Sequence, residues 1–147
     1  MKRFVLILLV ICMLLSLCAC GGKKDNPESS GNDGSKADIT GCWELSSVAT
    51  KAAVGGLTVS VYVDFVSGGS FTLYQKIGDG RYTKFTGAYV LSSDNKLSGK
   101  YDGGDNWGPY SAQISATSLV LTTAGGKEAD TYTKVKAIPD AVLQNLY

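Results

Sequence analysis

Histidine is absent from this chain of 147 residues, and its absence excludes several kinds of chemistry. Without it the chain lacks the usual zinc ligand, the Ser-His-Asp arrangement and the commonest pH switch near neutrality. Asp and Glu residues are present, but none has a spacing that marks a glycosidase-like pair. We therefore expect that the protein is not an enzyme and that it uses no metal or cofactor.

Cysteine is scarce in the part of the chain that is expected to fold. Of the four cysteines, Cys12 and Cys18 lie in an apolar N-terminal segment and Cys20 lies at its end, so that Cys42 is left alone. No intramolecular disulfide is then expected, and the fold must be held by core packing. With no histidine to activate its thiol, Cys42 is not expected to be catalytic.

An excess of charge of either sign is also missing. The chain has 14 Lys and Arg against 13 Asp and Glu, and removal of Lys2 and Arg3 with the N-terminal segment leaves 12 against 13. The lysines are scattered among aspartates, and nucleic-acid binding relies on a concentrated basic surface. No nucleic-acid partner is expected.

The N-terminus has the features of a secretory signal peptide over residues 1–19. Lys2 and Arg3 precede an apolar run from Phe4 to Leu15, and small residues follow it. A membrane-spanning helix needs about 20 apolar residues, and this run is shorter, which makes an uncleaved transmembrane helix the weaker alternative. Both interpretations place the rest of the chain outside the cytoplasm.

Residues 17–20, Leu-Cys-Ala-Cys, resemble the lipobox of bacterial lipoproteins. The resemblance implies cleavage before Cys20 and lipidation of Cys20 with palmitate-type chains, so that the membrane is a partner through the lipid anchor. Several acyl chains hold firmly, whereas one chain binds only marginally. The Cys20-Gly21 start implies the outer membrane of the bacterial cell envelope, with the outer face of the cytoplasmic membrane as the alternative.

Residues 21–38 contain Gly, Lys, Asp, Asn, Pro, Glu and Ser with one Ala, and none of them suits a hydrophobic core. We expect residues 20–38 to form the lipidated cysteine and a disordered linker. The folded domain is expected over residues 39–147.

Apolar and polar residues alternate after Ile39, which indicates β-strands. The clearest run places Leu57, Val59, Val61, Val63 and Phe65 on one face. Glycine-rich turn signals separate successive runs, and Pro139 begins a short helix at about 139–146. The predicted strands are 39–48, 57–66, 70–77, 81–91, 96–101, 108–115, 118–124 and 128–136.

Eight strands joined by tight turns predict an all-β fold, an eight-stranded antiparallel up-and-down barrel with a short C-terminal helix. A two-sheet sandwich is the alternative. A barrel of this size is either filled by its own side chains or holds one small ligand, and we expect it to be mostly filled with a shallow mouth. The alternation predicts an interior of Ile39, Trp43, Leu45, Val59, Val61, Val63, Phe65, Phe71, Leu73, Phe85, Tyr89, Leu91, Ile114, Leu119 and Leu121.

Gly41-Cys42-Trp43 resembles the Gly-x-Trp motif that opens the barrel of lipocalins and related calycins. With residues 65–71, 87–89 and 130–135, it makes the chain similar to the lipocalin-like lipoproteins of Bacteroidetes. The resemblance implies that Trp43 plugs the closed end of the barrel. The chain differs from the ligand-carrying lipocalins in having no Thr-Asp-Tyr motif and no evident arginine over the tryptophan.

Two functions are compatible with these features. The first is binding of a small apolar or amphipathic ligand inside the barrel, for which the candidate residues are Val61, Val63, Phe65, Phe71, Leu73, Phe85, Tyr89 and Trp107. The second is a solid-barrel structural module that docks proteins or surface glycans on Trp107, on the loops or on the outward tyrosines Tyr62, Tyr74 and Tyr132.

Trp107 is predicted in a glycine-rich loop over residues 102–108, between the fifth and sixth strands. There it would either stack on a sugar or a partner, or fold back over the end of the barrel. Asp102, Asp105 and Asn106 in the same loop lack the spacing of an EF-hand calcium loop. A plain turn is expected.

Overall fold

The computed structural model describes residues 38–47 and 57–147. The predicted signal peptide, Cys20 and the linker up to residue 37 lie outside the described residues. In the described part, no helix has both the length and the apolar character that crossing a membrane requires.

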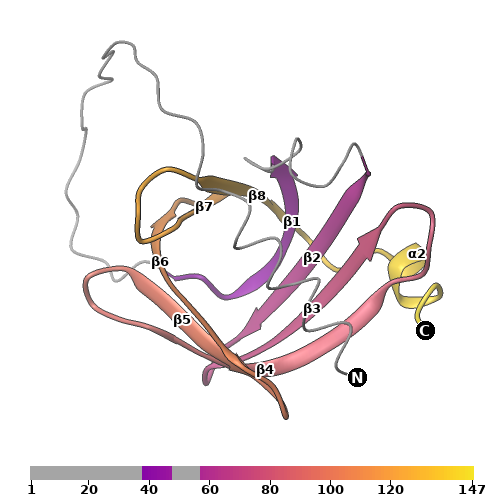
Figure 1. Ribbon diagram of the computed structural model, residues 1–147, viewed down its shortest axis with the longest axis horizontal. Coiled ribbons are helices and arrows are strands. Elements are labelled where there is room, and N and C mark those ends of the chain that lie inside the picture. The colour runs from indigo at the N-terminus through magenta and orange to yellow at the C-terminus, as the bar shows by residue number, and fades with distance from the viewer. Residues whose placement is uncertain (1–37, 48–56) are drawn as a thin grey trace.

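Eight antiparallel strands follow one another around a closed barrel (Figure 1). The last strand pairs with the first, with Lys134 opposite Trp43 and Tyr132 opposite Leu45. The predicted eight-stranded up-and-down barrel is confirmed, and the sandwich alternative is wrong. The strands are β1 Gly41–Ser47, β2 Val59–Val66, β3 Ser70–Ile77, β4 Thr83–Leu91, β5 Lys96–Tyr101, β6 Asn106–Ile114, β7 Ser118–Thr122 and β8 Ala129–Val135.

The hydrophobic core lies inside the barrel, where the alternation directs apolar side chains from all strands. Trp43, Leu97 and Leu119 are fully buried. The register pairs Phe65 with Phe71, so inward residues of neighbouring strands meet across the ladder. The buried core consists of Ile39, Trp43, Val63, Phe65, Phe71, Leu97, Ala112 and Leu119.

The prediction that Phe85 is part of the buried interior is wrong. Its pairing with Leu73 places it on the inner face of β4, yet its side chain is 36% exposed. The β4–β5 ladder begins only at Gly87, opposite Tyr101, so Phe85 lies beyond the end of β5. A side chain at the rim has fewer strands to cover it than one in the middle of the barrel.

The C-terminal helix is shorter than predicted and packs on the outside of the barrel. Helix α2, Asp140–Leu143, lies on the side of β3 and β4 (Figure 1). Val142 packs there against Tyr74 and Tyr82, which are 8% and 7% exposed. Tyr74 faces outward as predicted, but the prediction that it is available to partners is wrong, because α2 covers it.

Candidate functional site

The closed end of the barrel is built around Trp43. The indole Nε1–H donates a hydrogen bond to the carbonyl oxygen of Ile39 at 2.8 Å. The ammonium of Lys134 lies 4.2 Å from the centre of the Trp43 ring, and it donates a hydrogen bond to the carbonyl of Thr40. Lysine thus provides the cation over the tryptophan for which the sequence shows no evident arginine.

Gly41 makes this arrangement possible. Its φ is +105°, in the left-handed region, and a Cβ built there would lie 2.8 Å from the Nζ of Lys134. A side chain at position 41 would therefore be strained by this φ and would displace the end of the Lys134 side chain that covers Trp43. The Gly-x-Trp motif has a physical explanation in this protein, because its glycine provides the space for the cation.

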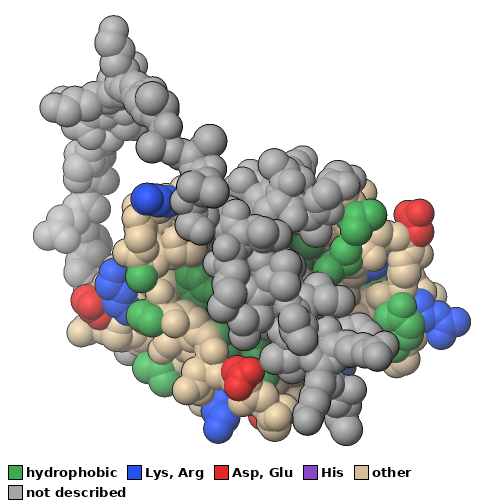
Figure 2. All heavy atoms as spheres, in the orientation of Figure 1, with side chains coloured by type: hydrophobic (Ala, Val, Ile, Leu, Met, Phe, Trp, Pro, Cys, Tyr) green, Lys and Arg blue, Asp and Glu red, His purple; other side chains and the backbone are tan. Residues whose placement is uncertain are grey.

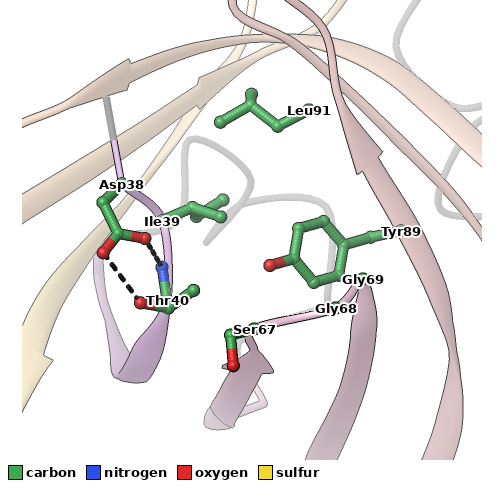
Figure 3. A pocket seen from close by; sticks show the side chains of 8 residues that line it. All are labelled: Asp38, Ile39, Thr40, Ser67, Gly68, Gly69, Tyr89 and Leu91. Carbon is green, nitrogen blue, oxygen red and sulfur yellow. Dashed lines mark hydrogen bonds between the residues drawn. The ribbon is translucent and has the colours of Figure 1, made fainter. Parts of the chain in front are cut away.

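A pocket of about 430 Å³ lies at this closed end (Figure 3). Asp38 accepts hydrogen bonds from the backbone and hydroxyl of Thr40, both at 2.9 Å, and these bonds lower the pKa of its carboxyl. Across the pocket, the Tyr89 hydroxyl donates to the carbonyl of Val66 at 3.1 Å. The carboxylate and the phenol of this pocket already have partners within the protein.

A second cavity, of about 130 Å³, lies inside the barrel. An apolar cavity of about 150 Å³ holds one benzene molecule, whereas drug-sized ligands occupy about 300–1,000 Å³. The barrel is therefore mostly filled, with room for one molecule about the size of a single ring. Its walls are Val63, Phe65, Phe71, Leu73, Leu97, Tyr101, Trp107, Tyr110, Leu121, Asp130 and Tyr132.

Trp107 lies in β6 and lines this cavity, so the prediction that it belongs to a loop at the rim is wrong. Trp107 pairs with Gly99 and Tyr110 pairs with Leu97. The two residues on β6 are three positions apart, whereas their partners on β5 are two positions apart, so β6 contains one extra residue here. Such a bulge reverses the alternation locally. It places Trp107 and Tyr110 on the same inner face despite their odd spacing, which simple alternation does not predict.

Two glycines provide the space for the aromatic walls of the cavity. A Cβ at Gly99 would lie 2.3 Å from Cζ2 of Trp107, and a Cβ at Gly87 would lie 2.7 Å from Cε1 of Phe71. The Phe71 and Trp107 rings meet edge to face at 5.5 Å, with an interplanar angle of 83°. The rings therefore pack closely over strand backbone that carries no side chain.

The cavity also contains polar groups. The Nε1–H of Trp107 is buried and has no hydrogen-bond acceptor among the described residues. Burial, and after it the charge of Asp130, raises the pKa of Tyr132. Burial likewise raises the pKa of Tyr101, with Tyr110 as the further cause. Asp130 provides the one carboxylate among the described residues that line the cavity.

Only some of the predicted ligand-binding residues meet at this cavity. Val61 is buried in another part of the barrel, Tyr89 lines the closed-end pocket and Phe85 is at the rim. The sequence-based set omits Leu97, Tyr101, Tyr110, Leu121, Asp130 and Tyr132, although alternation along 130–134 indicates a common face for the last two. The five predicted residues that do line the cavity are Val63, Phe65, Phe71, Leu73 and Trp107.

A family model for the lipocalin-like domain matches residues 39–121, which span β1 to β7 up to Leu121. The chain belongs to the lipocalin-like domain family. The match ends before β8, the strand that gives this lipocalin-like domain Asp130, Tyr132 and Lys134. Comparisons with curated proteins and with solved structures find no match.

The polar groups outside the two pockets form no metal site in the part of the domain that the structure describes. Among residues 38–47 and 57–147, no three His, Cys, Asp or Glu side chains are grouped closely enough to hold a metal ion. Asp102 accepts a hydrogen bond from Thr86 Oγ1 at 2.6 Å, which fastens its turn to β4. Burial raises the pKa of the Cys42 thiol, and the neighbouring Asp64 raises it further, so the reactive thiolate is disfavoured.

Proposed function

We propose that this protein is a lipid-anchored lipoprotein of the bacterial cell envelope, with the outer membrane favoured, whose barrel binds one small apolar or amphipathic molecule. The interior cavity of about 130 Å³ carries the proposal. We propose further that the protein acts by binding rather than by catalysis, through a domain attached to the membrane at Cys20.

The lining of the cavity supports a binding role. Small-molecule sites combine mainly apolar walls with a few polar groups that orient the ligand. Leu73, Leu97 and Leu121 provide apolar wall, while Trp107 and Asp130 provide polar atoms. At the larger closed-end pocket, by contrast, the Asp38 carboxylate and Tyr89 hydroxyl are engaged in hydrogen bonds within the protein.

The alternative of a docking module loses three of the four aromatic residues named for it, and the hydroxyl of the fourth, Tyr62, donates a hydrogen bond to Glu44 at 2.7 Å. Trp107 and Tyr132 line the interior cavity, and Tyr74 is covered by α2. Figure 2 shows charged side chains of both signs scattered around the margin of one face rather than gathered into a patch. A protein or glycan partner therefore has less to support it than a small ligand has.

Binding in the cavity is tested with toluene, a probe about the size of the space. We expect saturable binding to the purified full-length protein, measured by chemical-shift changes of the methyl groups that line the cavity. Leu121→Phe fills the space and should abolish binding, whereas Val90→Phe, at a position that is 66% exposed, should leave it intact. Toluene binding that is absent from the wild type, or equal in both variants, contradicts the proposal.

The anchor is tested separately by metabolic labelling with radioactive palmitate. We expect Cys20→Ala to abolish incorporation and to release the protein from the membrane fraction. Cys18→Ala, which changes a cysteine two residues away, serves as the matched control and should remain labelled. Label retained in the Cys20→Ala protein would rule out Cys20 as the lipidated residue.

A further inference from the structure

The closed-end pocket offers hydrogen-bond acceptors to an occupant, because the donors of Thr40 and Tyr89 are used within the protein. The backbone N–H and the hydroxyl of Thr40 donate to the Asp38 carboxylate at 2.9 Å, and the Tyr89 hydroxyl donates to the Val66 carbonyl at 3.1 Å. A carboxylate has about four lone-pair sites, and a hydroxyl oxygen that donates its proton can still accept. Asp38 and Tyr89 both line the pocket and therefore retain acceptor capacity toward it.

A negative charge lies at one side of this pocket. The hydrogen bonds from Thr40, and to the smallest extent the charge of Lys134, lower the pKa of the Asp38 carboxyl, which is therefore ionised at neutral pH. Burial and, after it, the Asp38 charge raise the pKa of Tyr89, so the two groups are within electrostatic reach. Figure 3 shows the Tyr89 hydroxyl pointing toward the side that carries Asp38 and Thr40. A positive group with several N–H donors suits the space between them.

Both sides of the pocket are held in place by packing inside the barrel. Next to Asp38, Ile39 is 2% exposed and its carbonyl accepts the hydrogen bond of Trp43 Nε1 at 2.8 Å. Opposite, the Tyr89 ring meets the Phe65 ring edge to face, with centres 4.9 Å apart and an interplanar angle of 73°. Groups that are ordered before binding lose little conformational entropy when a ligand binds. The arrangement therefore suits a specific small ligand.

The pocket has room for an apolar body as well as a charged head. Its volume of about 430 Å³ lies within the range of about 300–1,000 Å³ that small-molecule sites occupy. Ile39 and Leu91 provide apolar wall, and Tyr89 provides an aromatic ring. Among the described residues, none lines both this pocket and the interior cavity, so the two are separate sites.

We propose that the closed-end pocket is a second binding site, for a small primary amine whose ammonium group donates to the Asp38 carboxylate and to the Tyr89 hydroxyl oxygen. The apolar part of the amine contacts Ile39 and Leu91. This inference goes beyond the proposed function, because a failure of toluene to bind in the interior cavity would leave it unaffected.

Two probes of nearly equal size test the charge of the ligand: benzylamine, which is protonated at pH 7, and benzyl alcohol, which is neutral. We expect benzylamine to bind about tenfold more tightly, because its hydrogen bond to the carboxylate joins two charged groups. Dissociation constants are measured at pH 7 by NMR titration of the full-length protein, followed at the backbone amides of Thr40, Gly68 and Gly69. Salt at about 0.5 M should weaken the binding of benzylamine and leave benzyl alcohol unchanged.

Three variants test the residues of the site. Asp38→Asn removes the charge with little change of shape and should lower the affinity for benzylamine to that for benzyl alcohol. Asp94→Asn is the matched control, because the Asp94 carboxylate also accepts a hydrogen bond from a hydroxyl, that of Ser92, but does not line the pocket. Tyr89→Phe keeps the ring, removes the acceptor oxygen and should weaken benzylamine binding about threefold.

Equal affinities for the two probes, or equal losses in Asp38→Asn and Asp94→Asn, would overturn the proposal. Benzylamine-induced shifts confined to the methyl groups of the interior cavity would do the same. The salt titration of the wild type gives an answer even if Asp38→Asn does not fold, since benzylamine binding that is insensitive to salt would contradict the role of the carboxylate. An unchanged affinity in Tyr89→Phe would contradict the second hydrogen bond.

Discussion

Trp43 and Trp107 both lie within the barrel, but their indole N–H groups have opposite environments. Trp43 is fully buried, donates to the Ile39 carbonyl at 2.8 Å and is covered by the ammonium of Lys134. Trp107 lines the cavity with its N–H buried and without an acceptor. The closed end provides an acceptor for the indole N–H of Trp43, so this hydrogen bond contributes to stability. The cavity wall leaves the N–H of Trp107 without an acceptor among the described residues.

The largest expected effect comes from removing the satisfied tryptophan. Trp43→Ala deletes a fully buried indole, and we expect the free energy of unfolding to fall by about 3–5 kcal/mol. Trp107→Phe keeps a ring in the cavity wall and should cost less than half as much. Urea denaturation followed by circular dichroism measures both losses in the free energy of unfolding. Equal losses would show that the two tryptophans contribute equally to stability.

Lys134 provides the next test of the closed end. Lys134→Met removes the cation over Trp43 and the hydrogen bond to Thr40, so we expect a loss of about 2 kcal/mol. Lys136→Met, at an exposed position two residues away, serves as the control and should change stability by less than about 0.5 kcal/mol. The same denaturation measurement applies, and a loss shared by both variants would point to net charge instead.

The stability of the protein at alkaline pH tests the environment of Tyr132 in the cavity wall. The pKa of Tyr132 is raised in the folded protein above its ordinary value of 10.0, so the folded state holds this proton more tightly than the unfolded state does. The contribution of this proton to the free energy of unfolding is therefore fully present below pH 10. It declines above pH 10 by up to about 1.4 kcal/mol per pH unit. Tyr132→Phe should flatten this decline in urea unfolding at pH 9–11. Tyr147→Phe, at a position that is 83% exposed, should leave the slope unchanged.

The smallest and most specific effect distinguishes the two N–H groups directly. Benzothiophene in place of the Trp43 indole should lower stability by about 1 kcal/mol, because the Ile39 carbonyl loses its donor. The same replacement at Trp107 should raise stability by about 1 kcal/mol, because it removes an unsatisfied buried donor. Thermal unfolding without ligand measures both, and shifts of the same sign would remove the distinction.

Local patterns were sufficient to predict the barrel, because alternation and glycine-rich turns are properties of neighbouring residues. The predicted strands and the inward position of Trp43 follow from them. The cavity depends instead on pairing between strands. A bulge turns Trp107 and Tyr110 inward, and the register between β1 and β8 decides that Tyr132 faces the interior and that Lys134 reaches Trp43.

The exposure of Phe85 and the burial of Tyr74 have similar origins. Phe85 has the alternation of a core residue, but its exposure depends on where β5 ends. Tyr74 has the alternation of a surface residue, but α2 returns to cover it. In each case another segment of the chain determines the exposure of the side chain, and the local pattern does not predict that contact.

The pairing of β8 with β1 also bears on the order in which the molecule assembles. Hydrogen bonds from Lys134 to Thr40 and from Ser46 to Thr131 join residues 94 and 85 positions apart. Contacts between such distant residues form slowly, because a long chain loses entropy when its ends are brought together. Strand β1 pairs with β2 and with β8, and the second pairing requires the last strand of the chain. The pairing of β8 with β1 therefore completes the barrel around the cavity, whose lining includes Asp130 and Tyr132 of β8.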